Sequence, residues 1–263
     1  MAFHDQVIWV MGASSGIGAA LVPLLAAAGA RLILSARRPR PLDDVRGAAG
    51  VAGDRLRTLL LDLEDLDSLP GLAAEAEALF GRIDGVVHAA GLGQRGRAAD
   101  TDFAVDRRLM TVNYLGPVAI TKAVLPGMLA RGGGRFTVVS SIAGLLGPPR
   151  RSGYAASKHA LHGFFDALRA ETVGTGVKVT IVCPGYVDTG FAGSALTEDG
   201  SPQGHAPRDR RGIPVGRCAR RILRAMEYDE RQVLIGGREV LAAHVNRLAP
   251  GLVARLLPRL SPP

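Results

Sequence analysis

The sequence is poor in cysteine, in aromatic residues and in lysine. Only Cys183 and Cys218 are cysteines, and neither has His or Cys neighbours at the spacing of a zinc site. Two cysteines cannot build a disulfide framework, so we expect a reducing, cytoplasmic location and no metal. Aromatic residues make up 5% of the chain. The densest basic runs contain none, which leaves no platform for stacking nucleic acid bases.

The formal net charge of +8 comes almost entirely from arginine. Three of the 32 basic residues are lysines, and the 29 arginines are spread through a chain rich in Ala, Gly and Pro. This dispersion indicates a compositional bias rather than a binding patch. We therefore expect no nucleic acid partner.

No apolar run is long enough to span a membrane. The N-terminal residues lack the basic region and long apolar stretch of a secretory signal. The apolar stretch 240–260 is interrupted by arginines, prolines and polar residues. We expect residues 241–263 to form an apolar, basic tail that packs on the domain, on a partner or on a membrane surface, with membrane contact less favoured.

Short apolar runs alternate with segments of helical periodicity, and 47% of the residues are hydrophobic. Strands are expected at 6–11, 31–36, 56–61, 86–87, 135–139, 177–183 and 232–235. The alternation predicts a single α/β domain over residues 1–240, with a doubly wound parallel sheet of about seven strands and helices on both faces. The aperiodic segment at about 190–216 is expected to be a lid.

A glycine-rich turn follows the first expected strand and opens a helix. Its residues are Gly12, Ala13, Ser14, Ser15, Gly16, Ile17 and Gly18. Glycines let a backbone approach a pyrophosphate, and the N–H groups at a helix N-terminus attract its charge. The spacing differs from the commoner Gly-x-Gly-x-x-Gly fingerprint, so an ordinary strand-to-helix turn stays open as an alternative.

The second expected strand ends in Arg37 and Arg38, with no acidic residue to bind a ribose 2′-hydroxyl. A guanidinium suits a 2′-phosphate because its planar donors bind phosphate oxygens as a fork. The pair therefore favours NADP over NAD, although two solvated charges in a loop are the simpler alternative.

Tyr154 and Lys158 are four residues apart in a segment of helical periodicity, which stacks the phenol and the ammonium on one face. Such a pair is expected by chance only about 0.05 times in a chain of this composition. A cation about 4 Å from the phenol would favour the phenolate by roughly 4 kcal/mol, enough to bring the pKa of Tyr154 near neutrality.

Together with Asp62, Ala90, Gly91, Asn113, Ser141, Pro184 and Gly185, the glycine turn and the Tyr154–Lys158 pair resemble the short-chain dehydrogenase/reductase family over roughly residues 6–190. The resemblance implies a Rossmann-type fold. It also implies a catalytic set in which Tyr154 exchanges a proton with the substrate oxygen and Ser141 hydrogen-bonds that oxygen. Lys158 would bind the nicotinamide ribose, and Asn113 would hold a water.

The same resemblance assigns cofactor contacts. The glycine turn, 12–18, would hold the pyrophosphate, Asp62 and Leu63 the adenine, and Val187 and Thr189 the carboxamide. Here His88 and Ala89 stand where the family often has two asparagines before Ala90 and Gly91.

The predicted function is NADP-dependent hydride transfer between the nicotinamide and a carbonyl or secondary alcohol. A weaker likeness to hydroxysteroid dehydrogenases indicates a lipophilic substrate, and the family resemblance implies a homodimer or homotetramer built on the helices that contain Asn113 and Tyr154. Two alternatives remain: a catalytically idle dinucleotide-binding scaffold, and a peripheral membrane protein that acts through its tail.

Overall fold

The computed structural model describes residues 3–50, 53–204 and 212–260. Seven parallel strands form one sheet in the order β3-β2-β1-β4-β5-β6-β9. These strands are β1 (Val7–Met11), β2 (Arg31–Ala36), β3 (Leu56–Leu60), β4 (Gly85–His88), β5 (Gly134–Val139), β6 (Val177–Pro184) and β9 (Gln232–Ile235). The strand order reverses between β1 and β4, which opens a crevice at the carboxyl ends of these strands.

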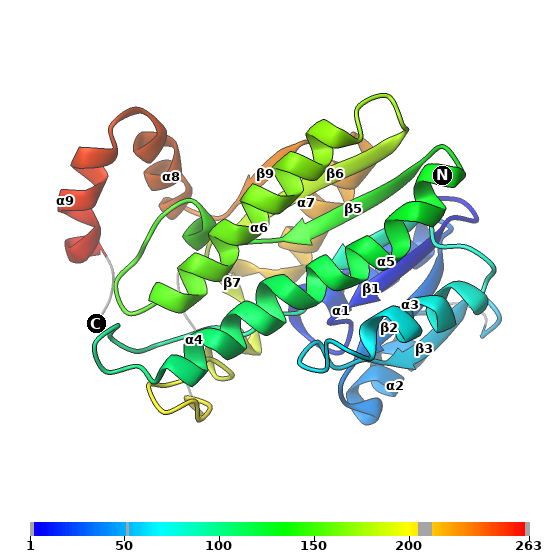
Figure 1. Cartoon of the computed structure of the whole chain (residues 1–263), viewed down its shortest axis with the longest axis horizontal. Coiled ribbons are helices and arrows are strands. Elements are labelled where there is room, and N and C mark those ends of the chain that lie inside the picture. Colours follow the sequence, from blue (N-terminus) through cyan, green and yellow to red (C-terminus); the bar gives the residue numbers. More distant parts are fainter. Residues whose placement is uncertain (1–2, 51–52, 205–211, 261–263) are drawn as a thin grey trace.

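Helices cover both faces of the sheet, and Figure 1 views the molecule from the side of α4, α5 and α6. This face carries α3 (Leu69–Ala78), α4 (Phe103–Met110), α5 (Gly116–Ala130) and α6 (Ser152–Glu171). The opposite face carries α1 (Gly16–Ala27), α2 (Pro39–Ala48) and α7 (Val215–Glu227). The expected single α/β domain, with about seven parallel strands and helices on both faces, is confirmed.

Two buried hydrophobic clusters, one on each face, hold these layers together. Alternate residues of β1 enter different clusters: Trp9 and Met11 pack with α3–α6, whereas Ile8 and Val10 pack with α1 and α7. Since successive side chains of a strand point to opposite faces, an all-apolar strand such as β1 is buried on both sides.

Residues 103–130 do not form one continuous α-helix. One π-helical turn, Thr111–Leu115, separates α4 from α5 and contains Asn113. Within the segment expected to be a lid, β8 (Ile213–Pro214) pairs with β7 (Val187–Asp188). Strands of two residues carry no periodicity that a sequence pattern could reveal. Part of the expected lid, 205–211, lies outside the described residues.

The tail forms two helices, α8 (Glu239–Leu248) and α9 (Pro250–Leu260), at one end of the sheet (Figure 1). Ala243 and Val253 are buried in the core, whereas Leu248 is 90% exposed. Among the described residues no helix has both the length and the hydropathy needed to cross a membrane.

Candidate active site

The glycine turn lies at the crevice between β1 and β4. Gly12 has a φ of +78°, and a Cβ there would lie 2.6 Å from the backbone nitrogen of Ala90. A Cβ on Gly18 would overlap the carbonyl oxygen of Gly12. The turn therefore packs backbone against backbone, an arrangement that only glycine permits and that fits the close approach of a pyrophosphate.

Helix α1 begins inside this turn. Ser15 occupies its N-cap position, but its side chain makes no capping hydrogen bond. Ser14 and Ile17 flank it, partly exposed. The N-terminus of α1 therefore has no cap from Ser15 and is suited to bind an anion.

Thr189, far away in the sequence, lies against the glycine turn. A Cβ on Gly16 would be 3.6 Å from Cγ2 of Thr189, which follows Val187 and β7. The residues predicted to hold the pyrophosphate and the carboxamide are thus brought together by the fold.

The arginines predicted to bind a 2′-phosphate are both exposed at the end of β2. Nη1 of Arg37 lies 3.3 Å from Oε1 of Glu64, and Arg108 binds both oxygens of the same carboxylate at 2.9 Å. Glu64 is a neighbour that the sequence analysis missed. Its place next to Asp62 and Leu63 was the only available signal.

Asp62 and Leu63 themselves differ in environment. The carboxylate of Asp62 is exposed and accepts a hydrogen bond from the backbone N–H of Glu64, at 3.0 Å. Leu63 is buried, and its side chain packs on Gly116 at the start of α5. Of these two residues, only Asp62 presents a polar side chain to solvent.

Lys158 is buried beneath the crevice and is held by β5. Its Nζ donates to the carbonyl oxygen of Val139 at 2.9 Å and lies 5.9 Å from the ring centre of Tyr154. A Cβ on Gly91 would be 3.0 Å from Oδ1 of Asn113 and 3.4 Å from Nζ of Lys158. Asn113 and Lys158 therefore meet at Gly91, and the ring of Tyr154 lies beside Lys158.

Asn113 uses its side chain to connect two backbone segments. Its amide donates to the carbonyl oxygen of Leu92 and to Oγ of Ser157, both at 2.9 Å. Its Oδ1 accepts from the N–H of Leu92 at 2.8 Å. A buried amide satisfied in this way holds the β4 exit against α6.

Ser141 lies two residues after the end of β5 and faces the end of β6. Its Oγ donates to the carbonyl oxygen of Pro184 at 3.3 Å and accepts from the N–H of Ala143 at 3.1 Å. Ser141 is also close enough to Tyr154 to act against the rise in the pKa of its phenol. Gly185, which follows Pro184, packs on the carboxylate of Glu239 at the start of α8. Ser141, Tyr154 and the residues at the end of β6 therefore form one group.

Burial dominates the ionisation of this group. It raises the pKa of Tyr154 above its ordinary value of 10.0, and the opposing effects come from the Ser141 hydrogen bond and from Arg151. Burial also lowers the pKa of Lys158 from 10.5 to about 8, with Cys183 opposing. The expected fall in the pKa of Tyr154 is therefore wrong for this structure, because desolvation disfavours the phenolate.

Gln94 is a buried residue that the sequence analysis missed. Helix α6 lacks a side-chain cap of its own, and Oε1 of Gln94 accepts the first-turn N–H of Tyr154 at 3.1 Å. Gln94 also forms a bridge with Leu196, which joins the expected lid to the same loop. No spacing rule marks a cap supplied from 60 residues away.

The phenol ring of Tyr154 has a second neighbour from the expected lid. The ring of Phe191 is centred 6.0 Å from it, tilted by 53°. The described part of this segment is thus docked beside the predicted proton donor.

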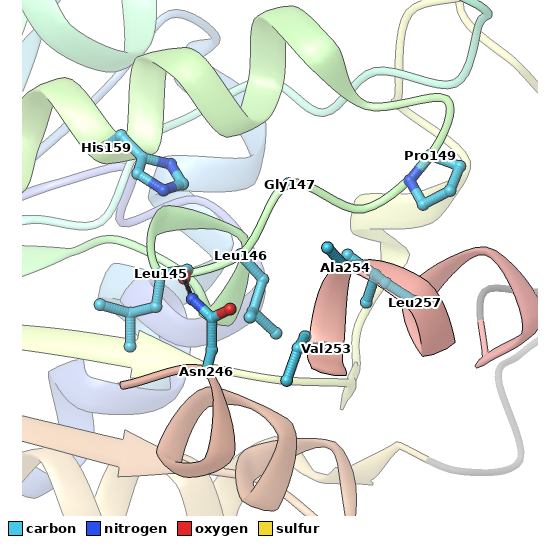
Figure 2. Close-up of a pocket in the computed structure, with 9 residues that line it drawn as sticks. All are labelled: Leu145, Leu146, Gly147, Pro149, His159, Asn246, Val253, Ala254 and Leu257. Atoms are coloured by element: carbon cyan, nitrogen blue, oxygen red, sulfur yellow. Dashed lines mark hydrogen bonds between the residues drawn. The ribbon is translucent and has the colours of Figure 1, made fainter. Parts of the chain in front are cut away.

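A pocket of about 340 Å³ lies beside this site, between the loop after Ser141 and the tail (Figure 2). Its walls are mainly apolar, with one imidazole and one amide: Leu145, Leu146, Gly147, Pro149, His159, Asn246, Val253, Ala254 and Leu257. Asn246 closes one side by donating to the carbonyl oxygen of Leu145 at 3.1 Å. Within the described ranges no group of His, Cys, Asp or Glu could hold a metal ion.

Comparison with known proteins points in one direction. The family described as short chain dehydrogenase matches residues 6–200. Dehydrogenase/reductase SDR family member 7B from Bos taurus is 39% identical over 262 residues, which cover 97% of this chain and 81% of that protein.

Solved structures give the same result. A short-chain dehydrogenase from Streptomyces avermitilis is 31% identical, with a TM-score of 0.81 over 95% of this chain and 96% of that one. A Burkholderia cenocepacia short chain dehydrogenase in complex with NADP is 26% identical, with a TM-score of 0.81 and full coverage of both chains. A Burkholderia phymatum enzyme in complex with NAD shares the fold at 22% identity and a TM-score of 0.84 over 96% of each chain.

Proposed function

This chain belongs to the short-chain dehydrogenase family of oxidoreductases, and we propose that it uses NADP to reduce a carbonyl, or to oxidise a secondary alcohol, on a lipophilic small molecule. The observation that carries the proposal is the convergence of Ser141, Tyr154 and Lys158 at the crevice where the glycine turn lies. Ligands of open parallel sheets bind at this edge.

The chain's own residues manage the proton. Because burial raises the pKa of Tyr154, its phenol is neutral and has a proton to donate to the carbonyl oxygen of a substrate. Ser141 would orient the same oxygen by turning its single hydroxyl proton from the carbonyl oxygen of Pro184 to the substrate. NADP, when bound, supplies or accepts the hydride.

Lys158 and Asn113 support this exchange. Lys158, held by Val139, would bind the nicotinamide ribose beside the phenol. The side chain of Asn113 is occupied by Leu92 and Ser157. Asn113 therefore offers a water only its remaining oxygen lone pair and its main-chain carbonyl.

The preference for NADP rests on the end of β2. Arg37 and Arg38 are exposed there, and the relative in complex with NADP adds support. Arg37→Asp should lower affinity for NADP and raise the relative use of NAD, measured as the ratio of the two kcat/KM values. Equal use of both cofactors by the wild type would refute the arginine argument.

The pocket in Figure 2 supports a lipophilic substrate because its volume and apolar walls suit a hydrocarbon chain. Along a series of linear 2-ketones, kcat/KM should rise by up to about fourfold per methylene, the equivalent of about 0.8 kcal/mol. Ala254→Phe should flatten this rise by filling the pocket. Leu252→Phe is the control, because Leu252 is 51% exposed on the same helix.

Tyr154→Phe tests the central assignment against the idle-scaffold alternative. Carbonyl reduction, followed at the NADPH absorbance band, should be lost while NADPH binding stays close to wild type. Tyr228→Phe is the matched control, since Tyr228 is 70% exposed at the end of α7. Turnover by Tyr154→Phe would show that another group donates the proton.

We also propose a cytoplasmic homodimer or homotetramer assembled on α5 and α6. Leu115, at the end of the π-helical turn before α5, and Leu129, near the end of α5, are 41% and 40% exposed. They provide apolar surface for such an interface. Light scattering after size exclusion should give two or four chain masses, and Leu129→Lys should lower that number.

A further inference from the structure

Two consecutive residues, Val139 at the end of β5 and Ser140 directly after it, contact Lys158. The carbonyl oxygen of Val139 accepts a hydrogen bond from Nζ of Lys158 at 2.9 Å. Oγ of Ser140 donates to the carbonyl oxygen of Lys158 at 3.1 Å. Ser141, with its predicted catalytic hydroxyl, comes next in the chain. Both ends of Lys158 are therefore attached to the strand that delivers Ser141.

His162 completes the surroundings of Ser140. It lies one helical turn after Lys158, and its Nε2 is 3.0 Å from Oγ of Ser140. Its Nδ1 is 3.5 Å from the side-chain nitrogen of Gln232, on β9. The Ser140 hydroxyl donates its single proton to the carbonyl oxygen of Lys158, so it must accept a hydrogen bond from Nε2–H of His162. Nδ1 of His162 then accepts from the side-chain nitrogen of Gln232. One neutral tautomer satisfies every group in this set.

The ionisation of His162 agrees with that tautomer. Burial lowers the pKa of His162 from 6.5 to about 4, and the nearby charges of Lys158, Arg169 and His159 act in the same direction against Asp166. The imidazole is therefore uncharged at neutral pH and acts as a fixed hydrogen-bond donor to Ser140.

Gly144 makes room for this contact. It ends the 3₁₀ turn after Ser141, and a Cβ there would lie 2.5 Å from Oγ of Ser140 and 2.9 Å from Nε2 of His162. Any larger residue would have to push the hydroxyl and the imidazole apart.

We propose that Ser140 and His162 are a positioning pair that sets the separation of Ser141 and Lys158 in the proton-transfer site. The pair acts through those two residues and rests on the proposed oxidoreductase function. Neither residue is marked in the sequence, because a serine and a histidine 22 positions apart form no motif.

The pair is tested by changing its hydrogen bonding while keeping the fold. His162→Leu removes the donor, whereas His162→Gln retains an N–H that can reach Ser140. We expect kcat to fall on the order of 10²-fold in His162→Leu, since an ångström of misplacement costs that much. KM and the Kd for NADPH should stay near wild type, and His162→Gln should recover most of kcat.

Two further variants keep the test decisive where His162→Leu unfolds. Ser140→Ala and Gly144→Ala should each lower kcat with KM unchanged, and Ser140→Ala should have little further effect in the His162→Leu background. Thr137→Val is the matched control, because Thr137 is a buried hydroxyl on the same strand. Its kcat should equal that of the wild type.

Crystal structures provide a readout that does not need turnover. The distance between Oγ of Ser141 and Nζ of Lys158 should increase in His162→Leu and stay at the wild-type value in His162→Gln. Unchanged kcat and an unchanged distance in His162→Leu would overturn the pairing, as would a glutamine variant as slow as the leucine variant. A wild type that turns over no carbonyl would instead refute the proposed function, and the distances would still decide the pair.

Discussion

Replacing Lys158 by methionine should change stability in a way that depends on pH. Lys158 is 4% exposed, and burial lowers its pKa from 10.5 to about 8. At 1.36 kcal/mol per unit, holding this ammonium charged inside the folded protein costs about 3 kcal/mol. Methionine fills a similar volume without the charge, so Lys158→Met removes that cost and also removes the hydrogen bond to Val139.

The sign follows from proton binding. Below about pH 8 Lys158 is charged in both the folded and the unfolded protein, and the full cost is present. Between about pH 8 and 10.5 the folded protein has released the proton while the unfolded chain still binds it. Stability due to Lys158 therefore rises with pH across this window, by about 3 kcal/mol in total.

Urea unfolding of wild type and Lys158→Met, without cofactor, measures this effect at pH 7 and at pH 10. The difference between the two proteins isolates Lys158, because Tyr154 and the two buried cysteines titrate in both. The free energy of unfolding of Lys158→Met minus that of the wild type should fall by at least about 2 kcal/mol between pH 7 and pH 10. A difference that does not change with pH would refute the buried, charged lysine.

Three further variants test separate contacts. Gly18→Ala should abolish binding of NADPH, followed by its fluorescence, because a Cβ there overlaps backbone, whereas Gly47→Ala has open space and should bind normally. Gln94→Leu should destabilise the protein by about 1 kcal/mol through the lost cap, and equal urea midpoints for wild type and variant would contradict the cap. Glu64→Gln should tighten NADP binding by up to about fivefold in calorimetry. The reason is that the exposed ion pair of Glu64 with Arg37, worth at most about 1 kcal/mol, no longer competes with the cofactor for Arg37. Weaker binding would show that the Glu64 carboxylate orients Arg37 instead.

The local parts of the site were predictable because each depends on residues close in the chain. Strand β1 followed by the glycine turn, and the four-residue spacing of Tyr154 and Lys158, are patterns that backbone geometry alone explains. Strands β1, β2 and β4 were visible for the same reason, since strands buried on both faces are largely apolar. The helices α8 and α9 were not assigned, because His244, Asn246 and Arg247 interrupt the apolar pattern of α8, and prolines and arginines interrupt that of α9.

What joins these parts depends on contacts between distant residues. The hydrogen bonds of Asn113 to Leu92 and Ser157, and of Gln94 to Tyr154, span 21 to 60 positions and have no period to detect. The π-helical turn that presents Asn113 was likewise invisible, because a local helical pattern does not distinguish it from a continuous helix.

The sequence by itself determined the parallel α/β sheet, the place of the dinucleotide crevice and the residue types that meet there, because hydrophobic periodicity and glycine turns act over a few residues. Only the tertiary structure decided the electrostatic state of the site. The Tyr154–Lys158 spacing alone predicts a lowered phenol pKa, whereas burial raises that pKa and lowers the pKa of the lysine. Desolvation depends on everything packed around a group, and that packing exists only once the chain has folded.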